Sequence, residues 1–311
     1  MKHELDTLLD IEDSDYRAID AISQSGMRMY ATDGPYAYYC RVVAKTHFTP
    51  VSKAMELGRA GHRFLETGCN VEKVFSVNPA KCVDAKIMET INDELTEAKS
   101  SAKQLKLGDK LDNRTKSHRL YKEMAQKDVD PELVVVDEDK LTMFKESVQS
   151  MYDSEVCRNI LLNGEYQCEM SIVRNNQGIH FKCRADVLKG SRIIDYKFTK
   201  HRNPSRWKKD AKYDGSFFQA LYYMRLFDRP RFTWLLICNQ PPHEAFAVTI
   251  TREALESDHS TVAQYCEELG CKKSISSIAD KTLQDMIDSY NCNVWHPDSW
   301  YHESDVDEAG W

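Results

Sequence analysis

An aspartate and a lysine two residues apart, Asp195 and Lys197, lie within the segment IIDYKFTK, which has the composition of a β-strand. Side chains alternate between the two faces of a strand, so these two charges share one face while Ile194 and Tyr196 share the other. Taken alone, the pattern also fits an ordinary ion pair on a solvent-facing strand. The choice between an ion pair and a reactive site depends on what the neighbouring strands carry.

Two further acids fall on the strands that precede this one. Apolar and polar residues alternate along residues 166–174 and 179–189, which predicts two strands joined by a hairpin turn at 175–178. A second turn at 190–191 leads into the strand of Asp195, and Glu169 and Asp186 lie on the first two strands. Carboxylates that converge at one edge of a sheet repel, and a divalent cation stabilises such a group. Hard oxygen ligands favour Mg²⁺ or Mn²⁺.

Lys197 has a chemical use beside such a cation. An ammonium next to a metal-bound water can orient that water, lower its pKa, or stabilise the charge that grows on a phosphorane-like transition state. Two acids followed by a lysine therefore indicate hydrolysis of a phosphodiester.

These residues carry a resemblance to a known group of enzymes. Asp186, followed by Asp195, Tyr196 and Lys197, resembles the motif of the PD-(D/E)XK nuclease superfamily. The segment GRAGHRFLE resembles the Gly-x-x-x-His helix of RecB-type nucleases, and QALYY resembles their Gln-x-x-x-Tyr helix. From about residue 52 to NVWHPDSW, the chain is most similar to the exonuclease VIII (RecE) branch found in phages and prophages.

The resemblance implies a role for each matching residue. It implies two Mg²⁺ or Mn²⁺ ions per site, with His62, Asp186, Asp195 and the backbone carbonyl of Tyr196 as metal ligands. Glu169 would be a ligand of the second metal or a proton acceptor, and Lys197 would be the catalytic lysine. Gln219 and Tyr223 would contact the DNA backbone. Whether Tyr222 or Tyr223 faces the site stays open. One departure is that Phe198 and Thr199 stand where family members often have two threonines.

A basic stretch follows the Asp195 strand directly. Seven Lys or Arg residues lie between Lys197 and Lys212, against the single acid Asp210. We expect DNA contacts from five of them: Lys200, Arg202, Arg206, Lys208 and Lys209. Trp207 and Tyr213 could stack on bases, as in single-strand channels. The alternative is an ordinary solvated face.

The remaining pattern predicts a mixed α/β domain with a central β-sheet flanked by helices. We expect helices in residues 1–50, 52–68, 141–163, 215–227 and 251–269, and strands at 231–240 and 244–251, the first of them buried at the centre of the sheet. The predicted organisation is a helical N-terminal elaboration (1–50), a nuclease domain of PD-(D/E)XK type (51–300) with an exposed helical or loop insertion at 84–130, and an acidic tail (301–311).

Composition narrows the class of protein. With 311 residues, 41% hydrophobic and 29% charged, the chain is typical of soluble globular proteins. It has no apolar run long enough for a membrane span and no signal peptide at its start, so we expect a cytosolic location. The ten cysteines are too dispersed for a disulfide framework. The spacing of Cys266, Cys271, Cys292 and His296 only loosely imitates a zinc site, and ordinary core cysteines are the favoured interpretation.

The sequence therefore predicts a metal-dependent DNA exonuclease that acts on duplex ends. The resemblance alone implies four further properties. They are 5′ to 3′ polarity, a ring-shaped homo-oligomer, a recombination role with a single-strand annealing partner, and a phage or prophage origin. An endonuclease or a CRISPR-adaptation-type end trimmer of the same fold is one alternative. A non-catalytic DNA-binding or partner-binding protein is another, and a zinc-stabilised interaction module is a third.

Overall fold

The structure is a computed structural model, and it describes residues 7–47, 53–77, 134–136, 138–257 and 275–295. Contacts along the chain define two compact units, residues 1–51 with 149–311 and residues 52–148. Each unit is described by itself.

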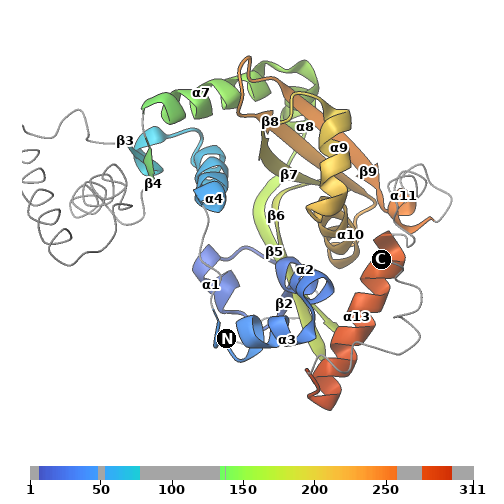
Figure 1. Ribbon diagram of the computed structural model, residues 1–311. Coiled ribbons are helices and arrows are strands. Elements are labelled where there is room, and N and C mark those ends of the chain that lie inside the picture. The colour runs from blue at the N-terminus through green and yellow to red at the C-terminus, as the bar shows by residue number, and fades with distance from the viewer. Residues whose placement is uncertain (1–6, 48–52, 78–133, 137, 258–274, 296–311) are drawn as a thin grey trace, which may run out of the picture. The chain divides into compact units, whose positions relative to one another are not determined.

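The larger unit is built on a seven-stranded mixed sheet (Figure 1). Its strands are β1 (Leu8–Leu9), β2 (Ile22–Ser23), β5 (Gln167–Asn176), β6 (Ile179–Lys189), β7 (Arg192–Thr199), β8 (Arg231–Cys238) and β9 (Ala245–Thr251). The order is β1-β5-β6-β7-β8-β9, and β2 pairs with β6. This sheet with its flanking helices confirms the predicted α/β fold class.

The predicted succession of three strands is confirmed, because β5, β6 and β7 are antiparallel neighbours. The hairpin turn between β5 and β6 forms where it was expected: the amide of Gly178 donates to Asn175 Oδ1 at 3.1 Å. Gly178 has φ 86°, a conformation that glycine adopts without strain. β8 is buried along almost its whole length between β7 and β9, as its continuous apolar sequence predicts.

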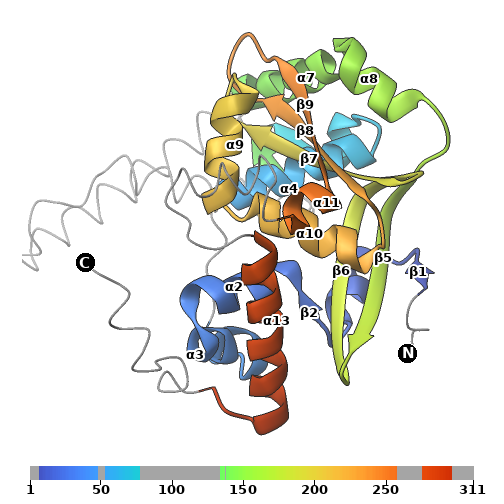
Figure 2. The same cartoon turned by 90° about the vertical axis from the view of Figure 1, so that its right-hand side faces the viewer.

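β7 and β8 are parallel, so two helices must return the chain from the end of one strand to the start of the next. These are α9 (Pro204–Tyr213) and α10 (Ser216–Leu226). Both pack on the sheet through apolar side chains, and the rings of Trp207 and Trp234 lie 5.0 Å apart. Helices α11 (Arg252–Glu256) and α13 (Ile275–Cys292) pack near α10 (Figure 2). α13 was not predicted, and residues 258–269 of the expected last helix lie outside the described part.

Residues 1–50 are not purely helical, which corrects the prediction. They hold α1 (Asp13–Ala18), α2 (Gln24–Asp33), α3 (Pro35–Tyr38) and a π-helical turn (Tyr39–Val43), but also β1 and β2. β1 extends the sheet beside β5, and β2 pairs with β6. The ammonium of the buried Lys182 donates to the carbonyls of Tyr16, Arg17 and Ile19 at 2.9, 3.3 and 2.7 Å. The segment is therefore an integral part of the larger unit.

The smaller unit packs a short two-stranded sheet with helices. It holds α4 (Lys53–Glu66), a 3-10 turn (Val71–Lys73), β3 (Phe75–Val77) paired in parallel with β4 (Val134–Val136), and the first part of α7 (Glu138–Asp153). Phe64, Phe75 and Phe144 form its aromatic core, with ring centroids 5.4 and 5.0 Å apart. The left-handed Gly68 (φ 67°) follows the end of α4, as predicted.

The helical segment predicted at 141–163 is two helices, α7 and α8 (Glu155–Leu162). The hydroxyl of Ser154 accepts from the amide of Cys157 at 3.4 Å, so a new N-cap begins where the sequence showed no break.

Several predictions fall outside the described residues: the insertion at 84–130, the acidic tail, and Cys266, Cys271 and His296 of the weighed zinc site. The seven described cysteines form no disulfide. Among the described helices, none has the length and apolar character needed to cross a membrane.

Candidate active site

Asp195 lies in the middle of β7, nearly buried, and two side chains reach its carboxylate. The Nζ atom of Lys197 lies 3.2 Å from Asp195 Oδ2, and the side-chain amide of Gln219 donates to Asp195 Oδ1 at 2.9 Å. Lys197 comes from the same face of the same strand, whereas Gln219 comes from α10. The alternation of side chains along β7 and the packing of α10 on the sheet therefore build this cluster.

Asp186 contacts the next strand through its side chain. Its Oδ2 atom accepts the backbone amide of Tyr196 at 2.8 Å, just beyond the point where the β6–β7 ladder ends. A carboxylate thus replaces the backbone acceptor that a longer ladder would supply. This contact fixes Asp186 beside the residue that joins Asp195 to Lys197.

The three predicted acids occupy one row across the sheet. The β5–β6 ladder pairs Cys168 with Val187 and Met170 with Ala185, so Glu169 and Asp186 fall at facing positions between them, although they form no ladder pair themselves. The β6–β7 register, extended by one residue past its last pair, sets Asp186 opposite Asp195. Residues opposite each other on neighbouring strands share a face, so the register explains how acids far apart in sequence come to one region.

Glu169 differs from the other two acids in its partner. Its Oε2 atom accepts from Arg184 Nε at 2.6 Å, in a pair that is only slightly exposed. Arg184 also donates to the carbonyl of Ile11 at 2.7 Å, so it links Glu169 to the N-terminal segment. Glu169 has φ 53°, a left-handed conformation that costs a non-glycine residue about 1–3 kcal/mol. The pair with Arg184 helps to hold this strained position.

The electrostatics of the cluster keep Lys197 charged. Burial alone lowers the pKa of Lys197, but the carboxylates of Asp195 and Asp186 more than offset burial, and the net pKa lies above the ordinary 10.5. Asp214, which ends α9 just before α10, adds to the same effect. At neutral pH, Lys197 is therefore an ammonium that can donate hydrogen bonds and stabilise negative charge, and it is not a proton acceptor.

The two tyrosines that the sequence left open have different surroundings. The hydroxyl of Tyr222 donates to the carbonyls of Ile22 and Lys182 at 2.8 and 3.1 Å, inside the core. Tyr223, one turn after Gln219, is only partly buried. Burial raises its pKa, and the charges of Asp195 and Asp186 raise it further. Tyr223 is thus the tyrosine within electrostatic reach of the acids.

The basic stretch forms the exposed face of α9 and the loop before it. The predicted contacts Lys200, Arg202, Arg206, Lys208 and Lys209 are all exposed. Lys200, Arg206 and Lys209 line an open cleft of about 570 Å³ together with His201, Asp210 and Gln240. Within this cleft, His201 Nε2 lies 2.8 Å from Asp210 Oδ2.

The predicted stacking role of Trp207 is wrong. Its side chain is 4% exposed and packs against Trp234, because it occupies the apolar face of the amphipathic helix α9. The side chain of Tyr213 lies outside the described part.

His62 is half-buried on α4 and belongs to the smaller unit, so its predicted place beside Asp186 and Asp195 stays a prediction. In the described residues, no group of three or more His, Cys, Asp or Glu side chains could hold a metal ion. Two carboxylates nevertheless fit Mg²⁺, which binds through one or two carboxylates and completes its shell with water and substrate phosphate. The carboxylates of Asp186 and Asp195 are of this kind, and their role as metal ligands stays a prediction.

Two polar residues of this region were not singled out from the sequence. Arg184 holds Glu169, and Asp214 raises the pKa of Lys197. The alternation of β6 places Arg184 on the same face as Asp186, which was a usable signal. Asp214 precedes a helix, and its Oδ1 atom accepts from the amide of Ser216 at 2.8 Å, so it reads as an ordinary cap.

Comparisons with known proteins give low similarity. No protein-family model and no curated protein matches the chain. Among solved structures, a candidate exonuclease from Eubacterium rectale matches with a TM-score of 0.48 and 10% identity, over 88% of each chain. A phage-related exonuclease from Haemophilus somnus 129PT matches with a TM-score of 0.27 and 16% identity, over 58% of this chain and 84% of that chain. These values transfer no activity, so function is argued from the site.

Proposed function

We propose that this protein is a metal-dependent nuclease of the PD-(D/E)XK type that hydrolyses phosphodiester bonds of DNA from duplex ends. The observation that carries the proposal is the pair of contacts on Asp195, which Lys197 approaches at 3.2 Å and Gln219 at 2.9 Å. A nearly buried carboxylate with an ammonium and an amide on it, next to a second carboxylate, is a costly arrangement that an ordinary strand does not need.

In this proposal, Asp186 and Asp195 hold a divalent cation, Mg²⁺ or Mn²⁺, and Glu169 and His62 assist with a second one. When bound, the cations would lower the pKa of a water molecule and stabilise charge on the phosphate. Glu169 can bind a cation only after its carboxylate leaves Arg184, so we assign it a smaller part in metal binding than Asp186 and Asp195.

The remaining residues orient the reacting groups and stabilise negative charge on the phosphate. Lys197 stays protonated at neutral pH, because nearby carboxylates raise its pKa, and its ammonium can donate to the attacking water or to a phosphate oxygen. Gln219 fixes one oxygen of Asp195 and leaves the carboxylate a single orientation. Tyr223 contacts the DNA backbone nearby. The cleft with Lys200, Arg206 and Lys209 takes the phosphates that flank the reacting one.

The finer assignment is an exonuclease VIII-like enzyme with 5′ to 3′ polarity. A ring of identical subunits, an annealing recombinase as partner, and a phage or prophage gene expressed in a bacterial cytoplasm belong to the same proposal. An overall charge of −7 would require a ring to turn its basic cleft toward the DNA.

Linear and closed-circular duplex DNA, digested side by side with Mg²⁺, test the proposal. An exonuclease degrades only the linear form, and Lys197→Ala should not. If both forms are cut, the protein is an endonuclease of the same fold. If the wild type leaves both intact with Mg²⁺ and with Mn²⁺, a non-catalytic binding protein becomes the better account.

A further inference from the structure

Three arginines gather at the start of β7 and β8, away from Asp195 and Lys197. Arg192 and Arg231 are direct partners in the parallel ladder, and Arg229 lies two residues before Arg231. Like charges that face each other on neighbouring strands destabilise a sheet. The chain therefore places positive charge here at a cost to its own stability.

No acid in the described residues neutralises these arginines. None of the three takes part in an ion pair there, and the single side-chain hydrogen bond among them runs from Arg231 to Ser191 Oγ at 3.1 Å. The Nε atom of Arg229 is buried and has no hydrogen-bond partner among the described groups. Burial lowers the pKa of Arg192, and the charge of Arg231 lowers it further. Burial also lowers the pKa of Lys189, and the charge of Arg192 lowers it further.

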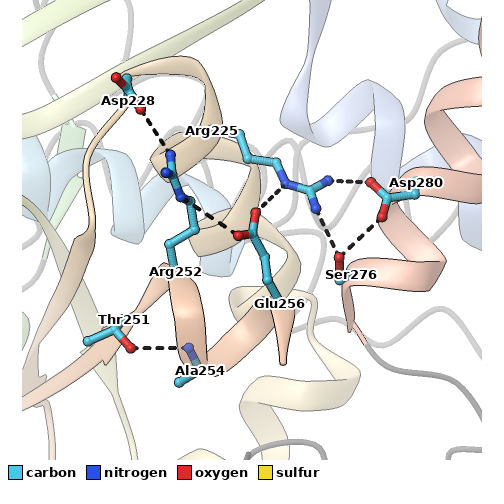
Figure 3. A network of polar contacts seen from close by, with 8 residues as sticks. All are labelled: Arg225, Asp228, Thr251, Arg252, Ala254, Glu256, Ser276 and Asp280. Atoms are coloured by element: carbon cyan, nitrogen blue, oxygen red, sulfur yellow. Dashed lines mark hydrogen bonds and ion pairs between the residues drawn. The ribbon is translucent and has the colours of Figure 1, made fainter. Parts of the chain in front are cut away.

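Elsewhere in the same unit, two arginines are paired with acids from neighbouring helices and loops. Figure 3 shows Arg225 bound to Glu256, Asp280 and Ser276, with the shortest contact 2.6 Å to Asp280. Arg252 lies 3.0 Å from Asp228 and also reaches Glu256. These arginines join α10, α11 and α13. What distinguishes the start of β7 and β8 is that Arg192 and Arg231 face each other directly in the ladder, so an anion bound there would relieve a like-charge contact.

The space for such a ligand is an open cleft of about 730 Å³. Of the three arginines, Arg229 lines it, and Gly190 of the lining adjoins Ser191, which accepts from Arg231. Tyr166 also lines the cleft, and its side chain is 54% exposed. Glu165 is the one acid among the lining residues, and it is exposed. A cleft this size is too large for a phosphate ion alone and suits a nucleotide unit.

We propose that Arg192, Arg229 and Arg231 form a second anion site, which binds a phosphate of single-stranded nucleic acid while Tyr166 stacks on a neighbouring base. Arginine forks recognise phosphate oxygens in pairs, and an aromatic side chain beside them is the usual platform for an unpaired base. The proposal rests on the proposed nuclease function, and it adds a site where a single-stranded segment is held apart from the reacting phosphate.

The test is fluorescence anisotropy with a short labelled single-stranded oligonucleotide, in EDTA so that no hydrolysis occurs. Arg192→Gln and Arg229→Gln should each weaken binding about tenfold and lower the slope of log K against log salt by about one. Tyr166→Ala should weaken it by roughly 5- to 100-fold, and Tyr166→Phe should not. Arg252→Gln is the matched control and should bind like the wild type.

Thermal unfolding separates a binding role from a structural one. Without ligand, Arg192→Gln should keep the wild-type Tm or raise it by about 1–3 °C, because it removes a like-charge contact. A lowered Tm together with lost binding would make Arg192 a structural residue and overturn the inference.

Three further results would also overturn the inference. The first is unchanged oligonucleotide binding by both arginine variants. The second is unchanged oligonucleotide binding by Tyr166→Ala together with equal competition by inorganic phosphate, and the third is an acidic peptide that binds in preference to the oligonucleotide and displaces it. Because binding is measured without divalent cations, failure here is distinct from failure of the nuclease proposal. The latter appears as absent digestion with Mg²⁺.

Discussion

Two regions of the parallel pair β7–β8 differ in how their charged side chains are paired. Near the middle of β7, Lys197 lies against Asp195, and Asp186 adds to the attraction that keeps Lys197 protonated. At the start of the pair, Arg192 and Arg231 lie side by side without an acid among the described residues. The first arrangement is balanced within the protein, and in our proposal it acts on a substrate phosphate. The second is unbalanced and is completed only when an anion binds.

The two clusters also differ in whether the sequence alone reveals them. A balanced cluster is visible in the sequence as acids and a lysine at strand spacing. An unbalanced one is visible only in three dimensions, because Arg192 and Arg231 are far apart in the chain and meet through the register of β7 and β8.

Loss of Lys197 should have the largest effect on the balanced cluster. Lys197→Ala should lower kcat for DNA hydrolysis by about 10²–10³-fold, because the donor that stabilises charge in the transition state is removed. Initial rates on labelled linear duplex measure this, with Lys281→Ala, at an exposed position of α13, as the control. A Lys197→Ala enzyme within about twofold of the wild type would remove Lys197 from the mechanism.

Gln219 should matter less, because it acts through Asp195. Gln219→Ala should reduce kcat by about 10- to 100-fold with little change in KM, as expected for a group that orients a metal-binding carboxylate. Gln219→Glu places a second carboxylate against that of Asp195, so it should lower kcat more than Gln219→Ala does. A rise in KM alone would make Gln219 a substrate-binding residue.

Much of the larger unit follows from the sequence, and the reasons are local. The strands β5, β6 and β7 have a period of two, and Asn175 and Gly178 define their turn, so sequence pattern alone predicts the three antiparallel strands that carry the acids. Asp195, Lys197 and Gln219 lie together in the structure, and their predicted roles toward metal and DNA stay predictions. Their exact partners were not predictable, because the contact of Gln219 depends on how α10 packs on β7.

What the sequence missed depends on tertiary contacts. β1 and β2 are two residues each, too short for a period, and they exist because β5 and β6 offer free edges. Trp207 lies among basic residues, and only the packing of α9 on Trp234 reveals that it is buried. The pairing of Glu169 with Arg184 across β5 and β6 required the register, which no single strand contains.

The Glu169–Arg184 pair should contribute to stability more than to chemistry. Arg184→Gln should lower the free energy of unfolding by about 1–2 kcal/mol, because it leaves a partly buried carboxylate at a strained residue without its charged partner. Urea unfolding measures this, and Arg17→Gln, whose pair with Asp13 is exposed, is the control. Equal stability of the two variants would contradict a structural role for Arg184.

The smallest effect is expected in the paired arginines of Figure 3. Arg252→Gln should change the free energy of unfolding by less than about 1 kcal/mol, since its contacts to Asp228 and Glu256 are largely solvent-exposed. Thermal unfolding is a sufficient measurement. A much larger loss would show that this network is more than a surface link, and would weaken its use as a control for the unpaired arginines.

The most direct test of the account is the rate at which the wild type and Asp195→Asn release nucleotides from labelled linear duplex DNA with Mg²⁺, after circular dichroism has shown that both are folded. We predict release by the wild type that EDTA abolishes, and a loss of about 10³-fold or more in Asp195→Asn. Equal rates for the two proteins, or no release by the wild type with either Mg²⁺ or Mn²⁺, would contradict the assignment of this cluster as a nuclease active site.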